Sequence, residues 1–234
     1  MRKNNQITIG LVAARKNSKG VKDKNLLKIN SKPITKIAID LAIKCKKIDY
    51  VILSSDSDRI LNLIKHKKLL KIKRKKSLCK DSTPMLPVIS NAVQFFEKSF
   101  KKRISKIVLF DPTAPLRKLG DIYKSIVIFN KKKPDLLISA HDSSHNPYFS
   151  MLERKGKYFS LSKFHGKNPG SRQSAPSVYD VNTLVWIYSK KAIVQIKKRI
   201  PNKTIIFKTD IDRSIDIDTK DDIKRIKYYL KKNG

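Results

Sequence analysis

Hydrophobic and polar positions alternate along this chain in two rhythms that together predict an α/β fold. Short apolar runs bounded by polar residues, which are typical of buried strands, take turns with longer segments where apolar residues recur every three or four positions. The predicted strands cover residues 7–13, 50–54, 104–110, 135–140 and 181–188, and the predicted helices cover 33–45, 56–66, 84–100, 119–130 and 219–231. Such alternation favours a mostly parallel sheet with helices on both faces.

Two helix starts and one interruption refine this pattern. Thr83-Pro84 supplies an N-cap residue and a proline suited to the first helical position, and Thr219 followed by Asp222 is a start signal for the last helix. Between residues 141 and 170 the rhythm gives way to aromatic residues among Gly, Asn and Lys, with a hairpin turn at 153–157. We therefore predict a single domain over residues 1–234 with an apolar arm at 141–170 that packs elsewhere, for example on a partner subunit.

The first predicted strand runs directly into a basic loop that contains Ser, Gly and Asn. Gly20 lets the backbone approach a ligand closely, and backbone N–H groups at such a turn can point at an anion. Arg15, Lys19 and Lys24 add charge-assisted donors that suit a triphosphate. The loop lacks the spacing of a P-loop and of a dinucleotide-binding turn. A phosphate-binding loop and a plain basic surface loop are both open at this point.

The carboxyl ends of the predicted parallel strands should meet at one rim, where ligands bind in open α/β sheets. This rim brings Arg15 together with residues 54–56 and 111–117. In the last of these segments two prolines, Pro112 and Pro115, fix a non-helical turn that presents Thr113 and backbone groups. The turn fits either a ligand contact or a structural connection between strand and helix.

Two aspartates, Asp216 and Asp218, alternate with Ile215 and Ile217 near the end of the chain. On a strand the aspartates would face the same side about 7 Å apart, while the isoleucines would face the core. Carboxylates so placed suit Mg²⁺ or Mn²⁺, because Mg²⁺ takes oxygen ligands and bridges to substrate phosphates. The alternative is that Asp218 or Thr219 only caps the final helix.

Polar residues also gather just ahead of the strand predicted at 181–188. Arg172 can pair with a ligand carboxylate, and Gln173 and Asn182 offer neutral hydrogen bonds. Within the strand, Trp186 and Tyr188 are expected in the core, because aromatic side chains bury large apolar surfaces.

The composition adds an unusual charge but no further site. The 234 residues include 54 Lys and Arg against 19 Asp and Glu, a formal net charge of +35. Such a charge prompts a nucleic-acid-binding hypothesis, yet the lysines are scattered over nearly every segment, so we expect no specific nucleic-acid partner. No apolar run approaches the length of a membrane helix, and the two cysteines lack metal or disulfide spacing. We expect a cytoplasmic protein with no membrane partner.

Taken in order, four segments resemble the motifs of the CMP-sialic acid synthetases, the cytidylyltransferases that activate nonulosonic acids. They are A-R-x-x-S-K-G-x-x-x-K-N at 14–25, P-T-A-P-L-R at 112–117, R-Q-x-x-P-x-x-Y-x-x-N at 172–182 and S-I-D-I-D-T at 214–219. The resemblance implies a Rossmann-like nucleotidyltransferase fold and a homodimer whose arm is a protruding β-ribbon. It also implies transfer of CMP from CTP to a nine-carbon acidic sugar, with release of pyrophosphate.

The same resemblance implies roles for individual residues. Arg15 and Lys24 would offset charge on the phosphates, and Arg74 would meet the cytosine. Asp216 and Asp218 would hold the divalent cation, so that Arg15, Lys24 and Asp218 are the expected catalytic residues. The expected nucleotide-binding residues are Ala13, Ala14, Arg15, Ser18, Lys24, Asn25, Arg74, Ser82 and Thr83. The expected sugar-binding residues are Asp111, Pro112, Thr113, Arg172, Gln173, Tyr179 and Asn182.

The chain departs from the motifs at positions that bear on the sugar. Asp111 stands where many of these enzymes carry glutamine, Thr183-Leu184 replaces Gly-Ala, and Phe149 stands where some carry lysine. The identity of the sugar, whether N-acetylneuraminic, legionaminic or pseudaminic acid, is therefore open. Two rival functions are open as well: another sugar nucleotidyltransferase, such as a Kdo cytidylyltransferase, and a basic nucleic-acid-binding protein.

Overall fold

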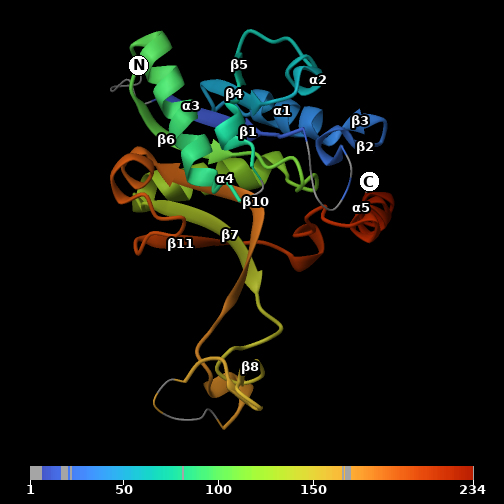
Figure 1. Ribbon diagram of the computed structural model, residues 1–234, viewed down its shortest axis with the longest axis vertical. Helices are drawn as coiled ribbons and strands as arrows, with labels where there is room; N and C mark the ends of the chain where they lie inside the picture. Colours follow the sequence, from blue (N-terminus) through green and yellow to red (C-terminus); the bar gives the residue numbers. More distant parts are fainter. Residues whose placement is uncertain are drawn as a thin grey trace.

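A mostly parallel sheet forms the centre of the computed structural model, which describes residues 7–16, 21, 23–80, 82–164, 166 and 170–233. The seven-stranded sheet has the order β11-β7-β10-β6-β1-β4-β5 (Figure 1). Its strands are β1 (Ile7–Ala13), β4 (Tyr50–Ser55), β5 (Leu69–Lys73), β6 (Ile104–Leu109), β7 (Leu136–Asp142), β10 (Tyr179–Ser189) and β11 (Thr204–Lys208). Only β10 runs antiparallel to its neighbours in this sheet. The α/β fold predicted from the sequence is confirmed.

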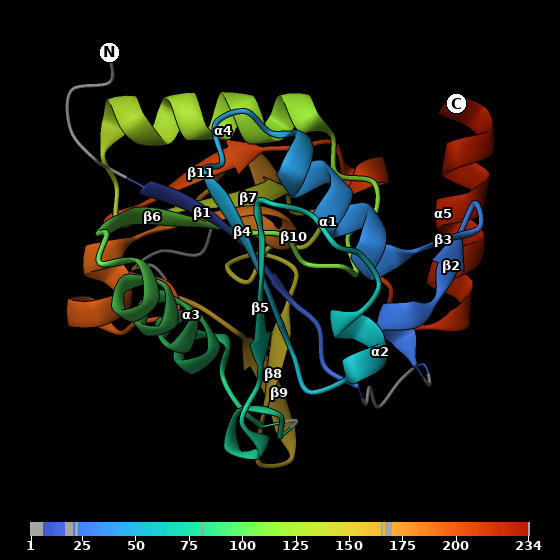
Figure 2. The same cartoon turned by 90° about the horizontal axis from the view of Figure 1, so that it is seen from above.

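Helices cover both faces of the sheet. α1 (Ile34–Lys44) and α4 (Leu119–Lys132) lie over one face, and α3 (Met85–Phe100) lies over the other (Figure 2). Val12 of β1 packs in the core cluster that contains α1 and α4, whereas Ile9 and Leu11 pack in the cluster that contains α3. Because side chains alternate across a strand, a run that is apolar at nearly every position suits a strand buried on both faces.

Two predictions about helix ends are wrong. The helix predicted over 56–66 is only α2 (Asp58–Leu61). The chain then continues into the edge strand β5, which was not predicted because its lysines interrupt the apolar run. α3 begins at Met85 rather than at Pro84, with Pro84 as its N-cap residue. Thr83 does not cap the helix with its side chain, because its hydroxyl donates a hydrogen bond to the carbonyl oxygen of Ser77.

The segment with the paired aspartates is also not a strand. It follows the 3₁₀ turn η5 (Ile211–Arg213) and leads into α5 (Lys220–Asn233). The amide of Ile217 donates to the carbonyl oxygen of Thr113 at 3.0 Å, and the Ile217 side chain is fully buried. Thr219 and Asp222 cap α5 as predicted, since each accepts a hydrogen bond from the backbone amide of the other. The segment is thereby attached to the turn after β6 instead of to a neighbouring strand.

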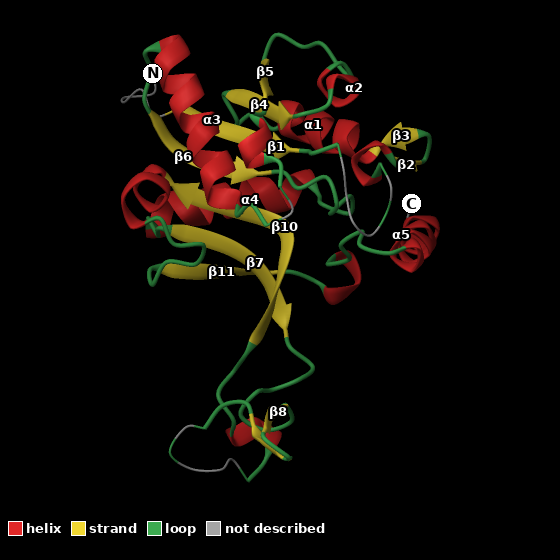
Figure 3. Cartoon of the chain, viewed as in Figure 1, coloured by secondary structure: helices red, strands yellow, loops and turns green. Residues whose placement is uncertain are grey.

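The region between β7 and β10 projects away from the sheet (Figure 3). Its tip carries the hairpin of β8 (Leu152–Lys155) and β9 (Tyr158–Leu161), which turns through Gly156 at φ +64°. Leu152, Tyr158 and Phe159 on this hairpin are each more than 60% exposed, at 63, 68 and 63%. The described part of this region therefore presents apolar side chains outside the core, and we keep the name arm for residues 141–170.

Short elements complete the chain. The hairpin of β2 (Lys28–Ile29) and β3 (Lys32–Pro33) follows the 3₁₀ turn η1 (Lys24–Leu26), and η2 (Lys76–Leu78), η3 (Arg172–Ser174) and the π-helical η4 (Ala192–Ile196) lie in connections. Among the helices that the structure describes, none is both long and apolar enough to cross a membrane.

Candidate functional site

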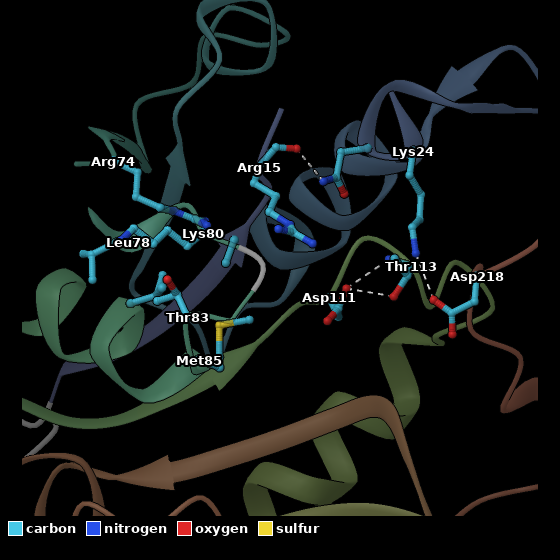
Figure 4. Close-up of a pocket in the computed structure, with 13 residues that line it drawn as sticks. Arg15, Lys24, Arg74, Leu78, Lys80, Thr83, Met85, Asp111, Thr113 and Asp218 are labelled. Carbon is cyan, nitrogen blue, oxygen red and sulfur yellow. Dashed lines mark hydrogen bonds and ion pairs between the residues drawn. The ribbon is translucent and has the colours of Figure 1, made fainter. Parts of the chain in front are cut away.

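A cavity of about 470 Å³ opens at the carboxyl ends of β1, β5 and β6 (Figure 4). Backbone hydrogen bonds join the end of β1 to its two neighbouring strands, with the amide of Ala14 bound to Ser54 of β4 and the amide of Phe110, after β6, bound to Leu11. The cavity is lined by Ala13, Arg15, Lys24, Asn25, Arg74, Leu78, Lys80, Thr83, Met85, Val88, Asp111, Thr113 and Asp218. The structure thus brings the loop after β1, the turn after β6 and the segment before α5 to one pocket.

One wall of the pocket carries two guanidinium groups, those of Arg15 and Arg74. Arg74 is only 7% exposed and is anchored to Ser54, whose hydroxyl oxygen lies 3.2 Å from Nε and whose carbonyl oxygen lies 2.7 Å from Nη2. Burial lowers the pKa of Arg74, and the positive charge of Arg15 lowers it further. Two arginines on one wall of a polar cavity suit an anionic ligand.

The loop after β1 is fastened back onto the strand end. The Asn25 side chain donates to the carbonyl oxygen of Arg15 at 2.8 Å, and the carbonyl oxygen of Asn25 accepts from the Thr35 hydroxyl at 2.6 Å. Asp23, just before the η1 turn, has φ 51°. This folding places the Lys24 ammonium in the pocket, where its Nζ lies 2.9 Å from Oδ1 of Asp218.

Opposite the arginines, two threonine hydroxyls surround the carboxylate of Asp216. The Oδ1 atom of Asp216 lies 2.6 Å from the Thr113 hydroxyl and 2.7 Å from the Thr183 hydroxyl. The Thr113 hydroxyl lies in turn 2.9 Å from Oδ1 of Asp111. Burial raises the pKa of Asp216, and the negative charge of Asp111 raises it further, while the two hydroxyl contacts act in the opposite direction.

A buried arginine holds this side of the pocket in place. Arg117, which is 7% exposed, donates to the carbonyl oxygens of Leu184, Thr183 and Asp111, the last two at 2.8 and 3.1 Å. Burial lowers the pKa of Arg117 to about 10, against the influence of nearby Asp111. Arg117 therefore ties the turn after β6 to β10, which fixes the distance between Thr113 and Thr183.

The carboxylates of this site fit a hard divalent cation. Asp111 and Asp218 line the pocket, Asp216 lies beside them, and the charges of both neighbours act on Asp216. Within the described ranges, no group of three or more acidic, His or Cys side chains is close enough to form a complete metal cage. Mg²⁺ commonly uses one or two carboxylates, several waters and substrate phosphates, so this sparse donor set suits it.

Several predicted nucleotide and sugar residues lie away from the pocket. Ala14 and Pro112 are buried, Ser82 is exposed, and Ser18 lies outside the described residues. Arg172 and Gln173 are exposed on η3 next to the arm. Tyr179 begins β10, with the Lys208 ammonium over its ring. The assignment of these residues to ligand binding stays a prediction.

The side chain of Asn182 is held by hydrogen bonds inside the protein. Its side-chain oxygen accepts from the Ser139 hydroxyl at 2.6 Å, and its side-chain nitrogen donates to the hydroxyls of Thr209 and Ser214 at 2.9 and 3.1 Å. Asn182 is only 5% exposed and lies in the irregular stretch of β10. In this chain its polar atoms join β7, β10 and the segment after β11, and a role in sugar binding stays a prediction.

An apolar cavity of about 270 Å³ adjoins the first pocket, with Met85 and Asp111 common to both. Its wall includes Trp186 and Tyr188, which are buried as predicted, and the guanidinium of Arg199 lies over the Trp186 ring.

The sequence analysis did not predict several of the residues that line the first pocket. Met85 and Val88 could have been found from their place in the first turn of α3. Leu78 and Lys80 lie in the basic segment that precedes this helix. The lining residues missed are Leu78, Lys80, Met85 and Val88. Thr183, beside Asp216, was noted in the sequence as a departure from the motif but was not assigned to the site.

Comparisons with known proteins agree with this geometry. The cytidylyltransferase family model matches residues 9–159. The chain is 31% identical over 225 residues to post-translational flagellin modification protein B of Campylobacter coli, covering 95% of this chain and 94% of the relative. It is 32% identical over 220 residues to CMP-N,N'-diacetyllegionaminic acid synthase of Campylobacter jejuni, covering 94 and 93%.

A solved structure shares the fold. It is CMP:2-keto-3-deoxy-manno-octonic acid synthetase complexed with CTP, with a TM-score of 0.69 at 11% identity, covering 98% of this chain and 100% of that one. Because the family model spans more than half of the chain and the sequence relatives align over nearly all of it, this protein belongs to the cytidylyltransferase family.

Proposed function

We propose that this protein transfers CMP from CTP to a nine-carbon acidic sugar, a nonulosonic acid, and releases pyrophosphate. The observation that carries the proposal is the pocket itself, in which Arg15, Lys24 and Arg74 face Asp111 and Asp218. Basic groups suit the triphosphate, and the carboxylates suit a cation bound to it. Support also comes from the relative that is named CMP-N,N'-diacetyllegionaminic acid synthase.

In this proposal the anomeric hydroxyl of the sugar attacks the α-phosphorus in line, and pyrophosphate leaves. Arg15 and Lys24 offset the negative charge that develops on the phosphates, while Arg74 contacts the cytosine. Asp216 and Asp218 would hold Mg²⁺ or Mn²⁺, and the bound cation would supply positive charge for the phosphates. Fixed positions and charges, rather than a covalent intermediate, supply most of the catalysis.

The sugar site combines the rim of the sheet with the arm. Asp111 lines both the first pocket and the apolar cavity that Trp186 also lines, and this cavity has the volume and polarity for an acyl substituent of the sugar. Arg172 and Gln173 lie outside the pocket of their own chain, so we propose that they reach the pocket of a second copy. The exposed apolar side chains of the arm support a homodimer, because such surface is costly to leave in water.

We place this activity in the cytoplasm, with CTP and the acidic sugar as partners and with neither a membrane nor a specific nucleic acid. Cys45 and Cys79 are free thiols, as a reducing compartment would keep them. The basic residues behind the net charge of +35 are scattered along the sequence, which supports a general attraction for anions rather than a surface that recognises a nucleic-acid sequence.

Nucleotide-induced stabilisation tests the proposal against the nucleic-acid alternative. With Mg²⁺ at about 0.2 M salt, CTP should raise the melting temperature and ATP should not, because the pocket that holds the base is expected to be too small for a purine. DNA binding that rests on scattered lysines releases counterions and should be lost at that salt concentration. Salt-resistant, sequence-selective DNA binding without stabilisation by CTP would overturn the enzyme function.

A further inference from the structure

The hydroxyl of Thr113 lies between two carboxylate oxygens and can donate to only one of them. Its Oγ1 is 2.9 Å from Oδ1 of Asp111 and 2.6 Å from Oδ1 of Asp216. A hydroxyl carries one proton and two lone pairs, so whichever carboxylate receives the proton leaves the other facing an oxygen lone pair. If Asp216 receives it, Asp111 is left with the backbone amide of Thr113, which donates to its Oδ1 at 3.1 Å. A half-satisfied polar network is costly when it is partly buried, as all three side chains are here.

A second hydroxyl, that of Thr183, supplies a further hydrogen-bond donor to these carboxylates. Thr183 donates to the same Oδ1 of Asp216 at 2.7 Å. Its position is well fixed, because it lies within β10 and its carbonyl oxygen accepts a hydrogen bond from the buried Arg117. With Thr183 supplying a proton to Asp216, the single proton of Thr113 can go to Asp111.

We propose that Thr183 is the positioning residue that holds the Asp216 carboxylate and so leaves the Thr113 hydroxyl for Asp111. The importance of this arrangement for catalysis rests on the proposed function, in which Asp216 binds the cation. Asp111 and Thr183 are also among the positions at which this chain departs from the motifs it otherwise matches. The hydrogen-bond network joins them through Thr113 and Asp216, so a change at one position should alter the effect of a change at the other.

The expected coupling has a definite direction. Thr183→Val keeps the shape of the side chain but removes its hydroxyl, which leaves Asp111 and Asp216 competing for one proton. Asp111→Asn removes that competition, because the amide can donate to the Thr113 oxygen and the hydroxyl can then donate to Asp216. The loss caused by Thr183→Val should therefore be smaller when residue 111 is Asn.

Urea unfolding of the metal-free full chain measures this coupling without any catalysis. Thr183→Val should raise the unfolding equilibrium constant by roughly 10-fold or more, the usual effect of losing a hydrogen bond to a charged group. In the Asp111→Asn background the effect should be at least about 3-fold smaller, which is within the range seen for residues in one network. Thr183→Ser, which keeps the hydroxyl, should restore most of the stability.

A matched control makes the same change elsewhere. The Thr204 hydroxyl, at the start of the edge strand β11, donates to the carbonyl oxygen of Pro201, so Thr204→Val should not couple to residue 111. If Thr183→Val fails to fold, Thr183→Ala gives the same comparison, because it also lacks the hydroxyl.

Binding of Mn²⁺ supplies the readout of positioning. Measured by electron paramagnetic resonance, the affinity of Thr183→Val for Mn²⁺ should fall about 10-fold, as for other residues that orient a metal ligand, with recovery in Thr183→Ser. Equal stability and Mn²⁺ affinity in wild type and Thr183→Val, or effects that simply add to those of Asp111→Asn, would overturn the proposal. Failure of the proposed function is a different result: wild-type protein would then release no pyrophosphate from CTP and sugar, whatever the coupling.

Discussion

Lys24 and Asp218 form an ion pair, with 2.9 Å between Nζ and Oδ1, although 194 positions separate them in the chain. The pair joins the loop after β1 to the segment before α5 at the side of the pocket away from Arg74 (Figure 4). Asp218 is 76% exposed and Lys24 is 13% exposed. Because ion pairs near solvent contribute only about 0–1 kcal/mol, an arriving phosphate and cation can separate the two at small cost. Lys24 would then contact the phosphate, and Asp218 would contact the cation.

Removal of either carboxylate assigned to the cation should abolish most turnover. Asp216→Ala and Asp218→Ala take away the oxygens that hold the ion and orient the phosphates, so the initial rate of pyrophosphate release should fall sharply in both. Asp221→Ala is the matched control, since Asp221 is exposed and pairs with Lys224 on α5. Excess chelator should likewise stop the wild-type enzyme, and full activity in chelator would remove the metal from the mechanism.

The two basic residues of the loop should be needed for rate. Lys24→Ala and Arg15→Ala should each lower the turnover number on the order of 10²-fold, as for loss of a preorganised charge next to the reacting group. Lys28→Ala, at an exposed position of β2 in the same region, should leave the rate within about 2-fold. The turnover numbers are compared by steady-state kinetics with CTP. Unchanged turnover in both Lys24→Ala and Arg15→Ala would show that this loop is a plain surface loop.

Asp216→Asn should stabilise the metal-free protein while removing activity. The pKa of Asp216 in the folded protein is raised above its ordinary value of 3.8, chiefly by burial. The folded state therefore binds this proton more tightly than the unfolded state, and stability is lost as pH rises from about 4 through the folded pKa. The neutral amide avoids that loss. The free energy of unfolding in urea should therefore become larger for the variant than for wild type as the pH rises above about 4. A variant that is less stable than wild type at neutral pH would contradict the sign of this effect.

Deletion of the arm should abolish both assembly and sugar binding. Leu152, Tyr158 and Phe159 expose apolar surface that a second copy would cover, and Arg172 and Gln173 lie in the adjoining η3 turn. Light scattering should therefore report a dimer for the whole chain and a monomer for the arm-deleted chain. Binding of CTP, which uses the pocket at the sheet rim, should be retained as a check on folding. A fully active monomer of the wild-type chain would be incompatible with an arm that completes the site of a partner.

Local patterns predicted the sheet and its rim because their signals lie within short segments. The apolar run before Arg15 and the run before Asp111 each define a buried strand, and parallel strands necessarily bring their carboxyl ends together. The contact of Thr183 with Asp216 could not be predicted in this way. It depends on the register shift within β10 and on the hydrogen bond from the Ile217 amide to the Thr113 carbonyl oxygen. Neither feature produces a periodic pattern in the sequence.

The same reason explains the wrong strand prediction at 214–219. Alternation of Ile and Asp is typical of a half-buried strand, and Ile217 is indeed buried. The backbone amide of Ile217, however, bonds to the turn after β6 rather than to a neighbouring strand. The alternation therefore indicated which side chains are buried, but not whether the segment pairs with a strand. Lining residues such as Met85 were missed because their place in the pocket follows from how α3 packs on the sheet.

The most direct test of the central claim is the choice of sugar. Purified protein with CTP and Mg²⁺ would be given N-acetylneuraminic, legionaminic or pseudaminic acid, or Kdo, one at a time. Pyrophosphate release and the mass of the product would be followed together. We predict a CMP-sugar from at least one of the nine-carbon acids, with a kcat/KM at least about 10-fold above that for Kdo, which corresponds to roughly 1.4 kcal/mol of transition-state binding. Turnover of Kdo alone, or CTP binding with no CMP-sugar from any nine-carbon acid, would contradict the account.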